Sequence, residues 1–318
     1  MSEFEIRLVA SPTRGSFGQV ALFVQSLRAL GYSSSDAFVK VFLGASCDDE
    51  IDALWHQPPN GVEVIWADQE SVRLNGFYAQ CDATFAHQDF RAALVVYCDT
   101  DTIWLQRIDE LLEKLRHSRD TIAGVIAHYP PPWQRGEVKD DENWSALGQA
   151  IVGSPLALDY AYSIRRDLPA PFYPNYGFVA MHSRIMESNG ADYLALADRA
   201  EEFLKLKYFK YQLAVPLLCK KYNIDTISLP PVYNFINDPA YEALYPALVP
   251  EAKVIHYLRL DRYDRSEVFS EVSAFREFLE AQRSGIDFVL QERVRHLWSD
   301  PPPHLATLAP HRAENPLK

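Results

Sequence analysis

The sequence has few cysteines, and they lack the spacing of a paired motif. Four cysteines are scattered over 318 residues, and no two of them form a Cys-x-x-Cys pair. This pattern is typical of reduced, partly buried thiols in a cytoplasmic protein. No apolar run approaches the roughly 18 residues of a membrane span. The start, MSEFEIRLVA, lacks the features of a signal peptide. We therefore expect a cytoplasmic protein without a transmembrane segment.

Positive charge is also scarce. The chain has 31 Lys and Arg residues against 43 Asp and Glu residues, which gives a formal net charge of −12. This balance argues against a nucleic-acid backbone or an anionic membrane as the main partner. A phosphate-bearing ligand would need local neutralisation, by a metal ion or by a few well-placed arginines. The chain is long enough for one large α/β domain or two smaller ones.

Apolar strands alternate with helical patterns over the first 130 residues. This alternation predicts an α/β fold with a doubly wound, mostly parallel sheet flanked by helices. The predicted strands are 5–10, 38–43, 62–66, 93–98 and 121–127, and the predicted helices include 75–87 and one that starts near Trp104.

The second half of the sequence is less regular. Residues 128–143 are predicted to form a surface loop, with a mobile lid as the alternative. A helical stretch over 193–222 should be kinked at Pro216. We predict a main domain over 1–265, a helical C-terminal extension over 266–299 that packs on it, and an extended or disordered tail over 300–318.

The most informative stretch is Ala93–Trp104, ALVVYCDTDTIW, in which a buried strand ends in Asp99 and Asp101. Ligands of open α/β sheets bind at the carboxyl ends of the strands. Ionised aspartates are almost never buried without a partner, so this aspartate doublet predicts a divalent cation with oxygen ligands. The alternative is that one of the two aspartates only caps the next helix.

Five motifs follow one another in a suggestive order. They are LVASPTRGSFGQVALFVQSL, VVYCDTDTIW, YPNYGFVAM, a glutamine-bearing helix that leads to LPPVYNF, and VIHYLR. Together they resemble the family 8 glycosyltransferases, the group of glycogenin and the bacterial lipopolysaccharide galactosyltransferases. The resemblance covers about residues 5–259 and implies the GT-A fold.

The resemblance implies that Asp99, Asp101 and His256 hold Mn²⁺ or Mg²⁺, and an imidazole ligand favours Mn²⁺. It also implies transfer of a sugar from a nucleotide-diphosphate sugar to a carbohydrate-like acceptor. A UDP-sugar is the expected donor, and the anomeric configuration of the sugar is expected to be retained. The alternative for His256 is a core histidine that is satisfied by a backbone carbonyl.

The resemblance also assigns the remaining site residues. Asn175 and Gln212 would be the catalytic residues and, with Tyr176 and Gly177, would face the donor sugar. The nucleotide would be bound by Ala10, Ser11, Pro12, Arg14, Arg73, Thr100 and Arg259.

Three positions depart from the family pattern. Tyr211 stands where family members usually have an aspartate. No Lys or Arg lies between Arg73 and Arg91, where many family members have a basic residue on the helix before the doublet, so Arg73 or Gln80 would have to substitute in contacting the donor. The usual glycine and lysine after the histidine are absent, and Arg259 or Arg262 would supply that charge.

Two other functions fit part of the sequence. Asp99-Thr100-Asp101-Thr102 also matches the start of haloacid dehalogenase phosphatases, with Asp99 as nucleophile, Asp101 as general acid and Mg²⁺ as cofactor. A GT-A-like binding module that has lost turnover is the second alternative.

Overall fold

The computed structural model describes residues 4–44, 48–133, 140–205, 207–298 and 301–302. Its centre is a seven-stranded sheet in which β9 runs antiparallel to both of its neighbours, β4 and β6, and the other pairs are parallel. The spatial order is β10 (Asp225–Ser228), β6 (Thr121–Ile126), β9 (Pro174–His182), β4 (Leu94–Asp99), β1 (Phe4–Val9), β2 (Ala37–Leu43) and β3 (Val62–Trp66).

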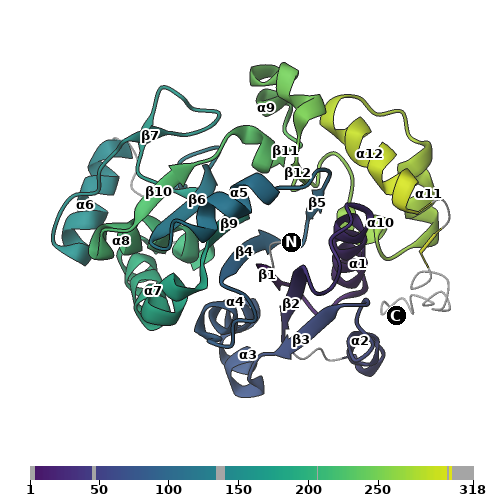
Figure 1. Ribbon diagram of the computed structural model, residues 1–318, viewed down its shortest axis with the longest axis horizontal. Helices are drawn as coiled ribbons and strands as arrows, with labels where there is room; N and C mark the ends of the chain where they lie inside the picture. Colours follow the sequence, from purple (N-terminus) through teal and green to yellow (C-terminus); the bar gives the residue numbers. More distant parts are fainter. Residues whose placement is uncertain (1–3, 45–47, 134–139, 206, 299–300, 303–318) are drawn as a thin grey trace, which may run out of the picture.

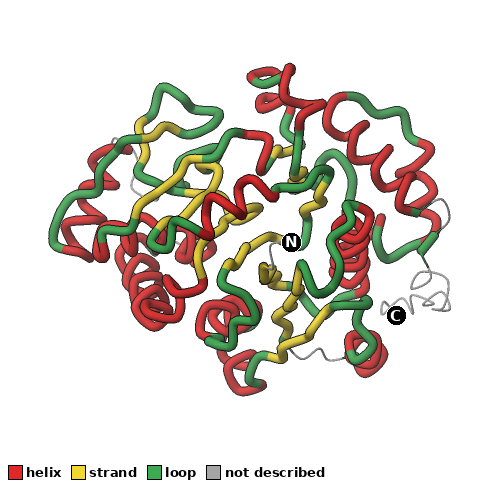
Figure 2. The backbone as a smooth tube through the Cα atoms, in the orientation of Figure 1, coloured by secondary structure: helices red, strands yellow, loops and turns green. Residues whose placement is uncertain are grey.

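Helices cover both faces of this sheet (Figures 1 and 2). Successive residues of a strand point to opposite faces, so Val96 packs with α1, α2 and α5, whereas Val95 and Tyr97 pack with α4, α6, α7 and α8. The helices are α1 (Arg14–Ala29), α2 (Asp49–Trp55), α3 (Gln69–Asn75), α4 (Phe77–Ala86), α5 (Asp109–Arg116), α6 (Asp140–Val152), α7 (Ser183–Leu204) and α8 (Lys210–Tyr222).

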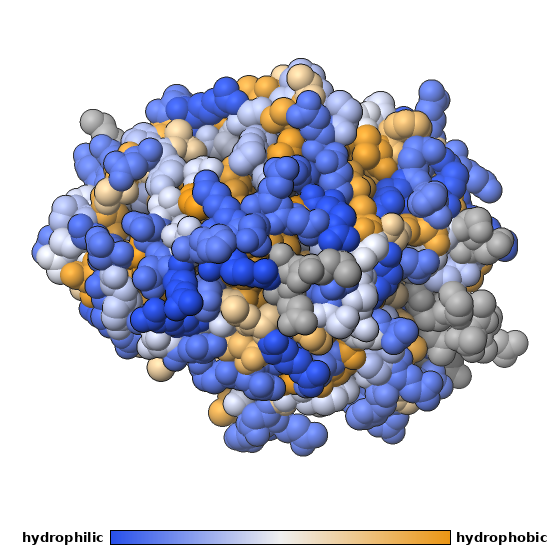
Figure 3. Space-filling model, in the orientation of Figure 1, coloured by the Kyte–Doolittle hydropathy of each residue, from blue (hydrophilic) through white to orange (hydrophobic). Residues whose placement is uncertain are grey.

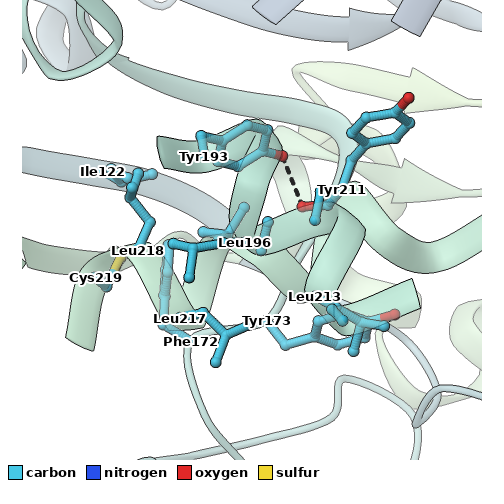
Figure 4. Packing of buried hydrophobic residues seen from close by; sticks show 14 of the residues in the cluster. Ile122, Phe172, Tyr173, Tyr193, Leu196, Tyr211, Leu213, Leu217, Leu218 and Cys219 are labelled. Carbon is cyan, nitrogen blue, oxygen red and sulfur yellow. Dashed lines mark hydrogen bonds between the residues drawn. The ribbon is translucent and has the colours of Figure 1, made fainter. Parts of the chain in front are cut away.

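The core beside α7 and α8 is rich in tyrosine, and two of its hydroxyl groups, those of Tyr176 and Tyr193, form hydrogen bonds inside the protein. Figure 4 shows the Tyr193 hydroxyl pointing at the backbone carbonyl of Tyr211, to which it donates a hydrogen bond of 2.6 Å. Tyr176 and Tyr193 also share a bond between their hydroxyls. These bonds tie the start of α8 to α7 and β9, because a buried hydroxyl needs a partner.

A smaller sheet joins the main domain to the C-terminal helices. It has the order β11 (Phe235–Ile236), β12 (Val254–His256) and β5 (Thr102–Trp104), and β12 is antiparallel to β5. Ile103 and Ile255 share a third hydrophobic core with Phe275 and Leu290 of the C-terminal helices. Those helices are α10 (Arg265–Val268), α11 (Val272–Glu280) and α12 (Gly285–Leu297), which lie at the opposite end of the molecule from α6–α8 (Figure 1).

Short elements make up the rest of the fold. They are β7 (Tyr160–Ala161), β8 (Pro169–Ala170), α9 (Pro239–Leu244) and the 3₁₀ helices η1 (Lys207–Phe209), η2 (Pro231–Tyr233) and η3 (Pro246–Glu251).

The predicted fold class is confirmed: a mostly parallel sheet is flanked by helices on both faces, with further helices at the C-terminal end. The division at residues 265 and 266 stays a prediction, and most of the predicted tail lies outside the described residues. Arg265, the last residue of the predicted main domain, is the first residue of α10.

Two helix predictions in the first half are wrong in detail. No helix starts near Trp104, because Thr102–Trp104 forms β5 against β12 and α5 begins only at Asp109. The predicted helix over 75–87 is instead two helices, α3 and α4. They separate at Gly76, whose φ of 59° is in a region that other residues rarely adopt.

Two predictions in the second half also need correction. The helical stretch over 193–222 breaks at Lys205, which has the left-handed φ of 57°, and α8 continues through Pro216. The predicted loop over 128–143 gives way to α6 at Asp140, while residues 134–139 lie outside the described part. Acidic residues in the first turn favour this helix start, since they interact well with the helix dipole.

Charged side chains also occur inside the main sheet. Glu5 and Arg7 of β1 and Lys40 of β2 are at most 1% exposed and form an interior charge network. Glu5 bonds the Arg7 Nε at 2.7 Å and lies 3.3 Å from the Lys40 Nζ. Arg7 also donates to the carbonyl oxygen of His87 at 2.7 Å, and Lys40 donates to that of Asp89. The network therefore fastens the end of α4 and the chain before β4 to the sheet.

Composition-based expectations are met only in part. Cys81, Cys98 and Cys219 are buried free thiols, and Cys47 lies outside the described residues. Among the described helices, none has the length and apolar character needed to cross a membrane. The cytoplasmic location stays a prediction.

Candidate metal and donor site

The aspartate doublet lies at the centre of the sheet edge. β4 is apolar and buried until it ends at Asp99. In the smaller sheet, the antiparallel register pairs His256 with Thr102, directly after the doublet. The backbone N–H of Tyr257 then donates to the carbonyl oxygen of Asp101 at 2.9 Å. β-sheet pairing thus brings residues that are far apart in the sequence into one cluster.

The three side chains face one another closely. Nε2 of His256 lies 3.2 Å from Oδ1 of Asp101 and 3.5 Å from Oδ2 of Asp99. One ligand atom from each residue lies within 4.8 Å of the other two. A cation with bonds of about 2.1 Å spans ligand atoms up to about 4 Å apart. Both distances from His256 lie within this span, so the three side chains are close enough to be candidates for binding one divalent ion.

The other ring nitrogen of His256 fixes its orientation. Nδ1 lies 3.1 Å from Oδ1 of Asn175 and 3.2 Å from Oδ1 of Asn234. Amide oxygens only accept hydrogen bonds, so Nδ1 carries a proton, and Nε2, which faces the aspartates, is the nitrogen that would bind a metal ion once the ring is neutral. This arrangement prepares a metal-binding histidine in the required tautomer.

Gly177 makes this arrangement possible by its lack of a side chain. A Cβ atom placed on it would overlap Nδ1 of His256 and Oδ1 of Asn234. Its backbone N–H donates to Oδ1 of Asn175 at 2.9 Å, and Nδ2 of Asn234 donates to the same oxygen at 2.8 Å. The Asn175 oxygen is thus used inside the protein, which leaves its NH₂ group for a ligand.

Charge and burial act on the cluster in opposite directions. Burial raises the pKa of Asp99 to about 6, and the Asp101 charge adds to this effect. The Asp99 side chain is nevertheless 47% exposed, because it lines an open cavity deep in the molecule. For Asp101, burial is outweighed by His256 and Arg265, and its pKa falls to about 2. Burial lowers the pKa of His256, but Asp101 outweighs it and the net shift is upward.

Arg265 completes the cluster, and no sequence motif pointed to it. Its Nη2 lies 3.0 Å from Oδ2 of Asp101, and its Nη1 donates to the carbonyl oxygen of Leu258 at 2.6 Å. The two arginines expected in its place are paired elsewhere. Arg259 binds Asp238 and Asp261, and Arg262 binds Asp287.

The cluster opens into a cavity of about 530 Å³. Seven of the predicted site residues line this cavity together: Asp99, Thr100, Asp101, Asn175, Tyr176, Gln212 and His256. Gln212 is anchored by a 3.2 Å bond from its Nε2 to the carbonyl oxygen of Pro174. Gly177 does not line the cavity; it lies directly against the ring of His256.

Four predicted nucleotide residues lie beside the cavity rather than in its lining. Ala10 and Ser11 follow β1, and the last β1 residue, Val9, pairs with Asp99 and lines the cavity. Pro12 precedes α1, and Arg14, the first residue of α1, lies 3.4 Å from Glu50. The structure thus brings the start of this loop to the doublet.

Arg73 and Arg259, which were also predicted to bind the nucleotide, do not line the cavity. Arg73 is on α3, 69% exposed and paired with Glu70, and it does not line the cavity. Gln80, its suggested substitute, donates to the carbonyl oxygen of Ala10 at 2.6 Å, so it supports the loop after β1.

Tyr211, which stands where an aspartate is usual, lines the cavity and donates to Oδ1 of Asp82 at 2.7 Å. Asn234, Arg265 and Asp82 were not expected from the sequence. Asn234 could have been suspected only from its place in LPPVYNF, because nothing local shows that it faces a histidine 22 residues later.

No protein-family model matches the chain, and no curated protein matches its sequence. Among solved structures, the galactosyltransferase LgtC in complex with donor and acceptor sugar analogues matches with a TM-score of 0.50 and 15% identity, over 80% of this chain and 87% of that one. An active-site mutant of LgtC matches with a TM-score of 0.50 and 14% identity, over the same shares. The chain has the GT-A fold.

A further match is the glycosyltransferase GlyE of Streptococcus pneumoniae TIGR4, with a TM-score of 0.49 and 13% identity, over 92% of this chain and 60% of that one. The resemblance to family 8 is confirmed at the level of the GT-A fold by the LgtC match.

The phosphatase interpretation assigns Asp101 the role of general acid. The general acid of that mechanism must be protonated, but the pKa of Asp101 is lowered to about 2. The nearby acidic run, which includes Asp140, forms the first turn of α6, and Asp140 accepts a 2.7 Å bond from the Tyr162 hydroxyl.

Proposed function

We propose that this protein is a metal-dependent glycosyltransferase that moves a sugar from a nucleotide-diphosphate sugar, in the first instance a UDP-sugar, to a carbohydrate-like acceptor. The observation that carries the proposal is the Asp99, Asp101 and His256 cluster, which faces an open cavity at the edge of a GT-A sheet. The match with LgtC, a galactosyltransferase studied with donor and acceptor sugar analogues, supports the same interpretation.

Asp99, Asp101 and Nε2 of His256 would hold the metal ion. A bound divalent cation would stabilise the negative charge that grows on the nucleoside diphosphate as it leaves. Because one ligand is an imidazole nitrogen, we favour Mn²⁺ over Mg²⁺. Asn175 and Asn234 would keep the ring in place, since both accept from Nδ1.

Arg265 would bind the diphosphate. Its guanidinium lies beside the doublet and lines the cavity, and a guanidinium can donate two bonds to one phosphate. A ligand phosphate would then replace Asp101 as one of its partners. The loop from Ala10 to Arg14, next to Asp99, would contact the nucleoside, and Thr100 would contact the phosphates.

Gln212 and Asn175 would act at the sugar end, with Tyr176 shaping the wall and Gly177 allowing close approach of the backbone. Gln212 lines the cavity from α8, and the active-site mutant of LgtC replaces a glutamine with glutamate. We propose that the Gln212 amide lies near the anomeric carbon. We also propose that the transferred sugar keeps its anomeric configuration. This is tested by determining which anomer the product contains.

The test is a thermal-shift series with UDP, GDP, ADP, CMP and inorganic phosphate, each with Mn²⁺ and with a chelator. A ligand at about 100 times its dissociation constant adds roughly 2.7 kcal/mol to the free energy of unfolding, which raises the midpoint visibly. We expect one nucleoside diphosphate to stabilise the protein only with Mn²⁺.

Asp101→Asn should abolish this shift, and Asp167→Asn is the matched control, because Asp167 is an exposed aspartate paired with Arg165. Nucleotide binding without hydrolysis or transfer of any donor would favour the binding module that has lost turnover, for which Tyr211 is the motivating residue. Mg²⁺-dependent cleavage of a phosphate ester without a nucleotide response would favour the phosphatase.

A further inference from the structure

Exposed aromatic side chains gather at the mouth of the cavity. Phe77 is 45% exposed, Tyr129 is 48% exposed and Tyr208 is 76% exposed, and all three line the cavity. They come from three separate elements: the start of α4, the segment after β6, and η1 between α7 and α8. We call these three residues the aromatic rim. Of the five large aromatic side chains that are exposed in the described part, only Tyr222 and Phe288 lie elsewhere.

Three rings around one opening are not a general property of this surface. The face seen in Figure 3 is mostly hydrophilic, with hydrophobic residues in small separate patches. Contact of apolar ring faces with water is unfavourable, and a ligand with apolar faces lowers the free energy by covering them. The C–H faces of a sugar ring stack well on aromatic rings, whose hydroxyls can bond its edges.

The charges that line the cavity restrict the ligand further. Among its described lining residues, Arg7 and Arg265 are the basic ones apart from two histidines. Arg7 is paired with Glu5, and Arg265 is paired with Asp101 and assigned to the diphosphate. Burial lowers the pKa of His128 to about 3, so that ring is neutral. An anionic acceptor would therefore find no free cation among these residues, and it would lie near two aspartates.

We propose that the aromatic rim is the acceptor subsite and that the acceptor is a neutral saccharide, bound by stacking on these rings. This inference rests on the proposed function and deepens it, because it names the class of acceptor.

The experiment measures transfer to neutral acceptors, for which methyl hexosides and neutral disaccharides serve as probes, and to uronic acids and sugar phosphates of the same size. Phe77→Ala, Tyr129→Ala and Tyr208→Ala are compared with the matched controls Tyr222→Ala and Phe288→Ala. For each variant we measure the acceptor KM, the Kd of the nucleotide with Mn²⁺, and the hydrolysis of the donor in the absence of acceptor.

We expect neutral acceptors to be preferred. The rim variants should raise the acceptor KM about five- to tenfold, more than they change the nucleotide Kd, while the controls change neither. The inference is overturned if the rim variants weaken nucleotide binding and spare the acceptor KM, which would make the rings a base-stacking site. It is also overturned if anionic acceptors are preferred or if no rim variant changes the acceptor KM.

Donor hydrolysis distinguishes a failure of the acceptor subsite from a failure of the proposed glycosyltransferase function. Hydrolysis by the wild type together with unchanged acceptor KM values in all rim variants rejects the acceptor subsite and leaves the glycosyltransferase intact. Absence of both Mn²⁺-dependent nucleotide binding and donor hydrolysis in the wild type rejects the function and the subsite with it.

Discussion

Two clusters of charged side chains lie on neighbouring strands and have opposite characters. In the interior charge network, Glu5 and the exposed Asp89 balance Arg7 and Lys40, and Glu5, Arg7 and Lys40 are at most 1% exposed. In the candidate metal site of Asp99, Asp101 and His256, the two aspartates share one permanent cation, Arg265, and Asp99 is 47% exposed in the cavity. The first cluster is complete within the protein, whereas the second retains uncompensated negative charge.

This difference indicates where binding can occur. Buried ions that satisfy one another hold elements together, and their bonds to the carbonyls of His87 and Asp89 fix the chain before β4. Charges that remain partly open and unmatched raise the free energy of the empty protein and lower it again when an ion arrives. Four substitutions test the contrast.

The largest effect is expected from Glu5→Gln. It leaves Arg7 and Lys40 buried without their carboxylate, and breaking such a group typically costs about 3–5 kcal/mol. Urea unfolding at neutral pH measures this loss. Glu70→Gln, which breaks the exposed pair with Arg73, is the control and should unfold with the wild type. Equal midpoints for both variants would remove the interior network as a stabilising element.

Next in size is Arg265→Ala, compared with Arg259→Ala. Loss of a charge-assisted contact to phosphate should weaken Mn²⁺-dependent nucleotide binding about 10- to 100-fold, and Arg265→Lys should recover part of it. Arg259, paired with Asp238 and Asp261, should change the nucleotide Kd little. Titration calorimetry with Mn²⁺ and UDP measures both. A larger effect of Arg259→Ala would support the sequence-based prediction that Arg259, and not Arg265, binds the nucleotide.

Asn234→Ala should weaken Mn²⁺ binding itself by about 10- to 100-fold, because His256 loses a partner that orients its ring. Paramagnetic resonance of free Mn²⁺ reports this affinity without any nucleotide. Asn189→Ala is a suitable control, since Asn189 bonds only its own helix on α7. An unchanged affinity would show that Asn175 alone holds the ring.

The smallest effect concerns Asp99→Asn in the metal-free protein. The pKa of Asp99 is raised to about 6 in the folded state, so the ionised group opposes folding at neutral pH. The full shift would be about 3 kcal/mol, but the side chain is 47% exposed, and screening should reduce this to about 1 kcal/mol.

The sign of the pH dependence follows from the direction of the shift. The folded protein holds the Asp99 proton more tightly than the unfolded chain, so this contribution to stability should fall as the pH rises from about 4 to 6 and should level off above that. Asp99→Asn should flatten this slope while it removes Mn²⁺ binding. Thermal unfolding in a chelator, from pH 4 to 7, measures the difference. A wild type that gains stability with rising pH in that window would contradict the prediction.

The sequence was informative where chemistry and strand periodicity coincide. A buried strand that ends in Asp99 and Asp101 places two carboxylates at the ligand edge of a sheet, where a cation is the natural partner. The strand β3 was also predicted at its observed bounds, Val62–Trp66. The sheet order, in contrast, depends on pairings between distant segments, which a single sequence does not record. β9 between β4 and β6 is such a case.

The missed residues share a physical reason. Arg265 reaches Asp101 only because the chain after β12 turns back, held by the Arg265 bond to the carbonyl of Leu258. Asn234 faces His256 through the pairing of β11 with β12. Polar side chains in loops and at helix starts have no periodicity, so their partners emerge only from tertiary structure.

The reversed strand β9 has a consequence for the order of assembly. It joins β4 to β6, so the half of the sheet made early in synthesis and the half that ends with β10 have no shared edge until His182 has been added. Pairings between distant segments form late, since their loop entropy must be overcome first. His256 follows later still in the chain. The complete group of Asp99, Asp101 and His256 can therefore form only after the strands of both halves of the sheet have been synthesised.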